Sequence, residues 1–258
     1  MKRILKSFLL IINYKTIIVT TLAVISTYVC IHLDLTAKFP DMLVGVAIVF
    51  PVVFSIGSAY NRRETALQRL SDFKGHAVAI YFATRDWPAD KKNEVSQLAR
   101  EIIVDAFKLM REMFMTSHNA EWGENEKRMY QKFSDLSALT IKMRDLGVQS
   151  TEISRINQYM SKMIIAFDNM KIIHNYRTPI TLRAYSKVFI YIFPILYGPY
   201  FASSHKDYSA ALEYVMPVLY SFILVSLDNI QDHLENPFDE VGEDDIRIDS
   251  QDTFSMLP

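Results

Sequence analysis

Long uncharged stretches alternate with charged ones along this chain of 258 residues. Three such stretches, residues 16–33, 42–61 and 188–204, are each about as long as a tilted membrane-spanning helix requires. A fourth, from Tyr208 to Leu227, contains Glu213 and has a shorter uncharged part, so its prediction depends on its pairing with the third. The pattern predicts four membrane-spanning helices arranged in two pairs.

The basic residues beside these stretches predict the orientation in the membrane. The loops 34–41 and 205–211 each carry one lysine. The opposite flanks are richer in basic residues: Lys2, Arg3, Lys6, Lys15, Arg62, Arg63, Arg177, Arg183 and Lys187. The positive-inside rule therefore places both termini and the middle of the chain in the cytoplasm. No small-residue cleavage site follows the first stretch, so it is interpreted as a retained span and not as a secretion signal.

The charged middle of the chain has the apolar spacing of helices. Steps of three and four residues make three stripes: Val95, Leu98, Ile102, Ala106, Leu109 and Met113; Met129, Phe133, Leu136, Leu139 and Met143; Ile153, Ile156, Met160, Met163 and Ile164. Each stripe predicts one helix with a single apolar face. The first is expected to begin near Pro88 and Asp90, and a turn over 117–125 is expected to end it. Gly147 is expected to end the second, and Ser150 or Thr151 to cap the third.

The predicted fold class is all-α, a polytopic membrane protein with four transmembrane helices and a cytoplasmic helical bundle. The expected division is 1–61 for the first two spans, 62–182 for the cytoplasmic helical region, 183–229 for the last two spans, and 230–258 for an acidic cytoplasmic tail. The expected localisation is the cell membrane.

Charge and cysteine content exclude several functions. The formal net charge of −1 does not favour a nucleic-acid partner. Cys30 is the only cysteine, so the chain forms no internal disulfide, and no two of the six histidines have the spacing of zinc ligands on one helix face. The sequence contains no phosphate-binding glycine loop and no nucleophile elbow. We therefore expect neither an enzyme nor a bound cofactor.

Three segments resemble the bestrophin family of ion channels, in a divergent bacterial-type branch. They are residues 44–64, with Phe-Pro-Val-Val-Phe before Tyr-Asn-Arg-Arg; residues 177–185, which begin Arg-Thr-Pro-Ile; and residues 234–245, with Asn-Pro-Phe before Gly-Glu-Asp-Asp. The resemblance covers nearly the whole chain. It implies a homopentamer in a lipid bilayer, with the second spans lining a pore for inorganic ions.

The resemblance also implies where the pore is narrow. Val46, Phe50 and Phe54 would form a hydrophobic neck, and steps of four residues do place them on one helix face. Ile180 would form a second, cytoplasmic aperture, although the proline before it also suits the start of a helix. Arg62 and Arg63 would concentrate anions at the pore exit or anchor the span. The open alternative for the neck residues is packing against neighbouring helices or lipid.

In animal bestrophins, a loop that corresponds to the acidic tail holds a calcium ion. Asp244 and Asp245 are the candidate ligands here, because calcium requires oxygen donors. Two departures count against the site: the insertion of residues 239–241, and the break in the acidic run at Ile246 and Arg247. The alternatives are an ordered belt and a solvated acidic tail.

The leading functional hypothesis is a passive anion channel, with chloride as the expected ion. A cation-selective channel of the same architecture is an alternative, because the neck segment carries no charge of either sign. A membrane-anchored scaffold that binds a cytoplasmic partner through its apolar stripes is the other alternative.

Overall fold

The structure is a computed structural model that describes residues 12–38, 41–90, 94–116, 120–177, 179–204, 213–240 and 245–249. The regular elements in these ranges are helices: α2 (Tyr14–His32), α3 (Asp41–Asp86), α4 (Val95–Met115), α5 (Ala120–Asp145), α6 (Ser150–Asn175), α7 (Ile180–Ser204) and α8 (Val215–Glu235). No β-strand occurs within the described ranges, as the all-α prediction requires.

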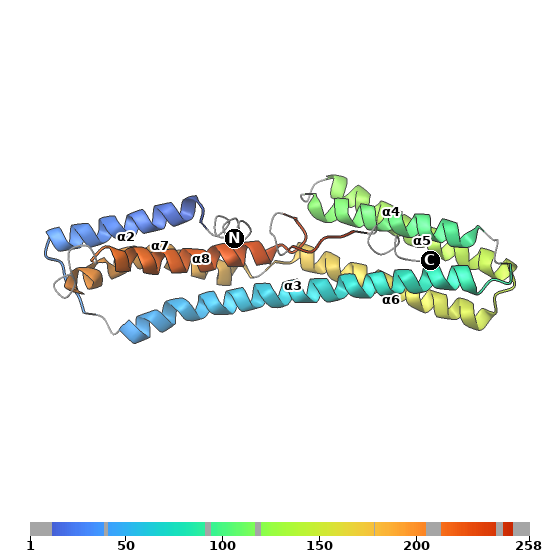
Figure 1. The fold of residues 1–258 in the computed structure, drawn as a ribbon, viewed down its shortest axis with the longest axis horizontal. Coiled ribbons are helices and arrows are strands. Elements are labelled where there is room, and N and C mark those ends of the chain that lie inside the picture. Colours follow the sequence, from blue (N-terminus) through green and yellow to red (C-terminus); the bar gives the residue numbers. More distant parts are fainter. Residues whose placement is uncertain are drawn as a thin grey trace, which may run out of the picture. The chain divides into compact units, whose positions relative to one another are not determined.

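The chain divides into two compact units, whose helices can be found by their labels in Figure 1. The first unit contains Met1–Asn61 and Arg177–Glu235, and the second contains Arg62–Tyr176 and Asn236–Pro258. Helix α3 contributes its first part to one unit and its second part to the other, because it continues without a break from Asp41 to Asp86. The sequence analysis predicted a span ending near residue 61, whereas the helix continues to Asp86 and is 46 residues long.

In the first unit, α2, α7 and α8 pack against one another. Their shared core contains Val19, Ile190, Phe193, Tyr197, Phe201, Leu224 and Val225. Gly198 lets α2 and α7 approach closely, since a Cβ atom there would overlap the side chain of Ser26 and lie 3.2 Å from the sulfur of Cys30. Cys30 is buried at this contact.

The surface of the first unit exposes many large apolar side chains. Examples are Ile17, Ile25 and Val29 on α2, Val49 and Val53 on α3, Ile192 and Ile195 on α7, and Leu219 and Ile223 on α8. Among the described residues, two segments are long and apolar enough to cross a membrane, Tyr14–His32 and Ser150–Ser203, and the second includes α7 up to Ser203. An apolar surface of this extent marks contact with lipid or with another protein.

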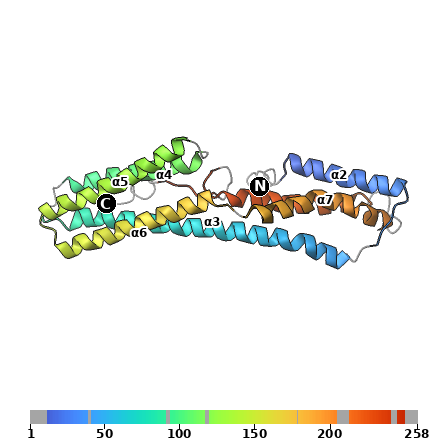
Figure 2. The same ribbon diagram turned by 180° about the vertical axis from the view of Figure 1, so that it is seen from behind.

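The second unit is a helical bundle made by α4, α5, α6 and the second part of α3 (Figure 2). All five residues of the predicted stripe on α5 are buried in its core, and the stripes on α4 and α6 are buried or packed against it. Gly147 ends α5 as predicted, with φ = 83° and the N–H of Val148 bonded to the carbonyl of Met143 at 3.1 Å. This is the Schellman arrangement that a glycine after a helix makes possible.

Three predicted helix boundaries in this unit were wrong. Helix α4 begins at Val95 and not near Pro88, because α3 extends to Asp86 and takes up the chain before it. Helix α5 begins at Ala120, so Gly123 lies in its first turns, where one glycine costs only about 1 kcal/mol; residues 117–119 of the predicted turn lie outside the described residues. Gln149, without a side-chain bond, is the N-cap of α6, and Ser150 and Thr151 are already helical.

Candidate pore-lining site

The predicted neck residues lie on the exposed face of α3 in the first unit. Val46, Phe50 and Phe54 are 54%, 59% and 58% exposed, respectively, whereas Val52 and Ser55 of the same helix are fully buried. The rings of Phe50 and Phe54 contact each other edge to face, with centroids 4.6 Å apart and an interplanar angle of 76°. The three side chains therefore make one apolar face that their own chain does not cover.

Ile180 is the first residue of α7, and its side chain is 75% exposed. The carbonyl of Pro179 accepts hydrogen bonds from the N–H groups of Leu182 and Arg183 at 3.1 and 3.2 Å. Pro179 thus lies directly before α7 and its carbonyl accepts the first hydrogen bonds of the helix, which is the structural role that the sequence analysis left open. The side chain of Ile180 is exposed, and its role in a cytoplasmic aperture stays a prediction.

Arg62 has a structural role that the sequence analysis did not foresee. Its guanidinium group donates hydrogen bonds to the carbonyls of Ile173 and Tyr176, at the C-terminal end of α6. Such carbonyls have no partner within their own helix, and a positive charge there is favourable to the helix dipole. Arg63 instead lies 2.6 Å from the carboxylate of Glu64. The two predicted exit charges are thus engaged with different partners.

The segment after α8 is anchored in the core of the second unit. Phe238, of the Asn-Pro-Phe motif, is 1% exposed and stacks on Phe114 with ring centroids 4.8 Å apart. Farther on, Ile246 and Ile248 are buried in the same core, and the N–H of Ile246 donates to the carbonyl of Pro237 at 2.8 Å. Of the two alternatives to a calcium loop, these contacts favour an ordered segment over a solvated tail.

An arginine occupies the region in which calcium was considered. The guanidinium of Arg111 donates two hydrogen bonds, of 2.7 and 2.6 Å, to the carboxylate of Glu240, whose φ is 56°. This pairing holds the pKa of the Glu240 carboxyl below its usual value. Asp245, Arg247 and Asp249 line the same hollow, of about 240 Å³.

The candidate calcium ligands do not form a metal site within the described residues. Asp244 lies outside them, and Asp245 shares its hollow with the positive charges of Arg111 and Arg247. Within the described ranges, no three His, Cys, Asp or Glu residues are grouped so that they could hold a metal ion. The two arginines beside Asp245 count against calcium at that residue, because calcium prefers carboxylate and carbonyl oxygens without competing cations.

Ion pairs join the helices of the first unit at one end. The ammonium group of Lys15, in the first turn of α2, lies 2.6 Å from Asp232 and 3.5 Å from Asp228. Lys187, on α7, lies 3.3 Å from the same Asp232. Both aspartates are on α8, so the beginnings of α2 and α7 meet the end of α8.

A second pair strengthens this junction. The guanidinium of Arg183 lies 3.1 Å from the carboxylate of Glu235, which is 3% exposed. The side-chain amide of Asn13 donates to the side-chain oxygen of Asn229 at 2.7 Å. The sequence analysis did not predict these partners.

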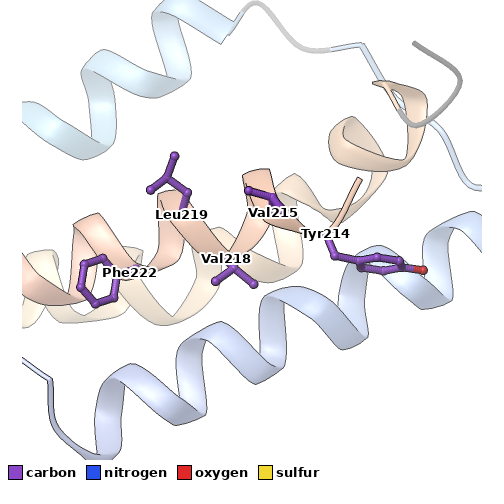
Figure 3. A pocket seen from close by; sticks show the side chains of 5 residues that line it. All are labelled: Tyr214, Val215, Val218, Leu219 and Phe222. Atoms are coloured by element: carbon purple, nitrogen blue, oxygen red, sulfur yellow. The ribbon is translucent and has the colours of Figure 1, made fainter. Parts of the chain in front are cut away.

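A hollow of about 370 Å³ lies along the outer part of α8 (Figure 3). Its lining residues are Tyr214, Val215, Val218, Leu219 and Phe222. The Tyr214 hydroxyl is the one oxygen that Figure 3 shows on these side chains, and it points away from the apolar groups. The hollow is therefore part of the apolar surface of the first unit.

Comparisons with known proteins give a structural likeness only. No family model matches the chain, and no curated protein matches it in sequence. A variant of a bacterial bestrophin homologue from Klebsiella pneumoniae has a similar structure, with a TM-score of 0.75 and 16% identity over 91% of this chain and 93% of that one. Another structure of a bestrophin homologue from the same organism covers 95% and 99%, with a TM-score of 0.73 and 13% identity.

A third structure, described as that of a membrane protein, has a TM-score of 0.76 and 15% identity over 95% of this chain and all of that one. These likenesses confirm the predicted bestrophin-like fold over nearly the whole chain. At identities this low they establish the fold and leave the function to be argued from the residues of this chain.

Proposed function

We propose that the chain is the pore-forming subunit of a homo-oligomeric ion channel in a membrane. The observation that carries this proposal is the uncovered apolar face of Val46, Phe50 and Phe54 on a chain with a bestrophin-like fold. A helix face with two adjacent exposed phenylalanines is unfavourable in water. Symmetric copies would bring these faces together around a central axis.

In this proposal, α2, the first part of α3, α7 and α8 cross the bilayer. The exposed apolar side chains on these helices support that assignment, because hydrocarbon is the favourable surrounding for them. The junction of Lys15, Lys187 and Asp232 supports the proposed topology. It brings together two helix beginnings and one helix end, which is what two consecutive pairs of spans with both termini in the cytoplasm require.

The neck would act as a hydrophobic gate. In a closed ring, each of the three residues would repeat around the axis and form a stack of apolar rings, with five members each if the ring is the pentamer that the resemblance implies. Apolar constrictions of this kind close by losing water and open by a small change in width. Ile180, exposed at the start of α7, would form the second, cytoplasmic constriction.

The neck carries no charge, so it does not decide between chloride and a cation. The sign of the ion must be set by fixed charges elsewhere along the path. We propose no catalytic role and no bound metal, since the features that carry the proposal are an apolar constriction and an oligomeric pore. Neither feature requires a reactive side chain.

Planar-bilayer recording of the purified wild-type protein and of the Phe50→Ala and Phe54→Ala variants tests this function. We expect ionic current from the wild type and a larger or less gated current from both variants, because smaller side chains widen the constriction. Ile25→Ala is the matched control, since Ile25 is a similarly exposed apolar residue, on α2. No current from wild type and variants that are folded and inserted would refute the channel, and a monomeric mass in detergent would support a membrane-anchored scaffold.

A further inference from the structure

The apolar face of the neck on α3 ends at a glycine. Successive residues are about 100° apart around an α-helix, so Val46 and Phe54 lie about 40° to either side of Phe50. Gly57 and Asn61 continue this face, each about 20° from the direction of Phe50. Both belong to the first unit, Gly57 is partly exposed, and Asn61 is exposed. Three large apolar side chains are thus followed on this face by a residue without a side chain and then by a polar amide.

Packing within the chain does not explain Gly57. A Cβ atom added there would have no other atom of the described residues within 4 Å, apart from its chain neighbours and the adjoining backbone of its own helix. At Gly198, by contrast, an added Cβ atom would overlap Ser26. Glycine within a helix is unfavourable relative to alanine, because it loses more conformational freedom on folding. Gly57 therefore weakens α3 without allowing a close contact between helices of its own chain.

We propose that Gly57 ends the hydrophobic neck and opens it into a wider, hydrated ring, in which permeating ions regain water. The inference rests on the proposed function and adds the residue that limits the length of the gate. In a symmetric ring of copies, the apolar part from Val46 to Phe54 would extend about 12 Å along the helix. At Gly57 the wall would consist of helix backbone, whose polar groups could approach the ions closely.

The length of the apolar part matters because an ion inside it has few ligands. A longer apolar constriction deprives the ion of water over a longer path, so the barrier to permeation rises. A methyl group at position 57 would add a further apolar ring about 4.5 Å beyond Phe54. The absence of a side chain at Gly57 therefore keeps the gate short.

Planar-bilayer recording of the Gly57→Ala, Gly57→Val and Gly57→Thr variants tests this inference. We expect Gly57→Ala to lower the current roughly threefold or more, and Gly57→Val to lower it further, because both lengthen the apolar neck. Threonine has nearly the shape of valine but carries a hydroxyl group, so Gly57→Thr should pass more current than Gly57→Val. The melting temperature of Gly57→Ala should equal or exceed that of the wild type, since alanine favours the helix and has open space there.

Gly123→Ala is the matched control, because Gly123 also has open space for a Cβ atom but lies on α5 of the second unit. Its current should equal that of the wild type. The inference would be overturned if Gly57→Ala passed the wild-type current, if Gly123→Ala lowered the current equally, or if Gly57→Thr passed no more than Gly57→Val. A loss of oligomeric mass in Gly57→Ala would also overturn it, because Gly57 would then pack against another copy. A folded and inserted wild type without current would instead contradict the proposed function itself.

Discussion

The Asn-Pro-Phe motif after α8 has a structural role that the Phe238→Ala variant can measure. The Phe238 ring is 1% exposed and stacks on Phe114 with an interplanar angle of 21°. Truncation of a fully buried phenylalanine to alanine costs about 3–5 kcal/mol through lost burial and the cavity that remains. Each kcal/mol lowers the melting temperature of a protein of this size by roughly 2–4 °C. We therefore expect the second unit to melt at least about 6 °C lower.

The assay is thermal unfolding of the detergent-solubilised protein, followed by circular dichroism, together with limited proteolysis. The variant should be cleaved after residue 236 under conditions in which the wild type is protected, since Phe238 anchors that segment. Phe238→Leu is the control: it keeps most of the apolar volume and should lose less than half as much stability. A shift below about 2 °C with unchanged proteolysis would show that the ring does not hold the segment in the core.

Three further results follow from contacts in the second unit. Replacement of Arg62 by Gln removes charged hydrogen bonds to the end of α6, so stability should fall by about 1–3 kcal/mol and amide exchange should rise in the last turn of α6. Burial and the nearby Lys162 lower the pKa of His76 from 6.5, so the neutral imidazole stabilises the fold above that pH. This contribution is lost as the pH falls through the lower pKa of His76 in the folded protein. The His76→Gln variant should therefore have a melting temperature that depends less on pH over that range. Calcium chelation should leave the protease resistance of the segment after α8 unchanged, whereas Arg111→Ala, which frees Glu240, should reduce it.

The helices of the bundle could be predicted because their period is local information. Met129 and Met143, at the two ends of one predicted stripe, are both buried, since steps of three and four residues keep one side of a helix toward the core. The boundaries were less predictable. The residue type of Pro88 indicated a helix start, but α3 continues to Asp86. Gly123 indicated a turn, but it lies within helix α5. Residue preferences of about 1 kcal/mol yield to the packing of neighbouring helices.

The candidate site was predictable in one respect only. The spacing of Val46, Phe50 and Phe54 placed them on one face, and the structure shows that this face is exposed. What the face meets depends on other copies of the chain, which a sequence does not place in space. The role of Arg62 could not be predicted from its flanking position either. Its bonds reach carbonyls 111 and 114 residues away, so they depend on how α3 and α6 pack.

The junction of the first unit extends this argument to charges beside the membrane. Lys15 meets Asp232 across 217 residues of sequence, and the sequence analysis assigned Lys15 only to the positive flank of a span. A basic residue there satisfies the positive-inside rule wherever its side chain points. The buried Asp228 adds a stricter demand, because a carboxylate in a dry interior is costly unless a cation lies beside it. Lys15 meets both demands at once, so its loss should disturb the packing of α2 on α8 more than the loss of a flanking charge that only faces water.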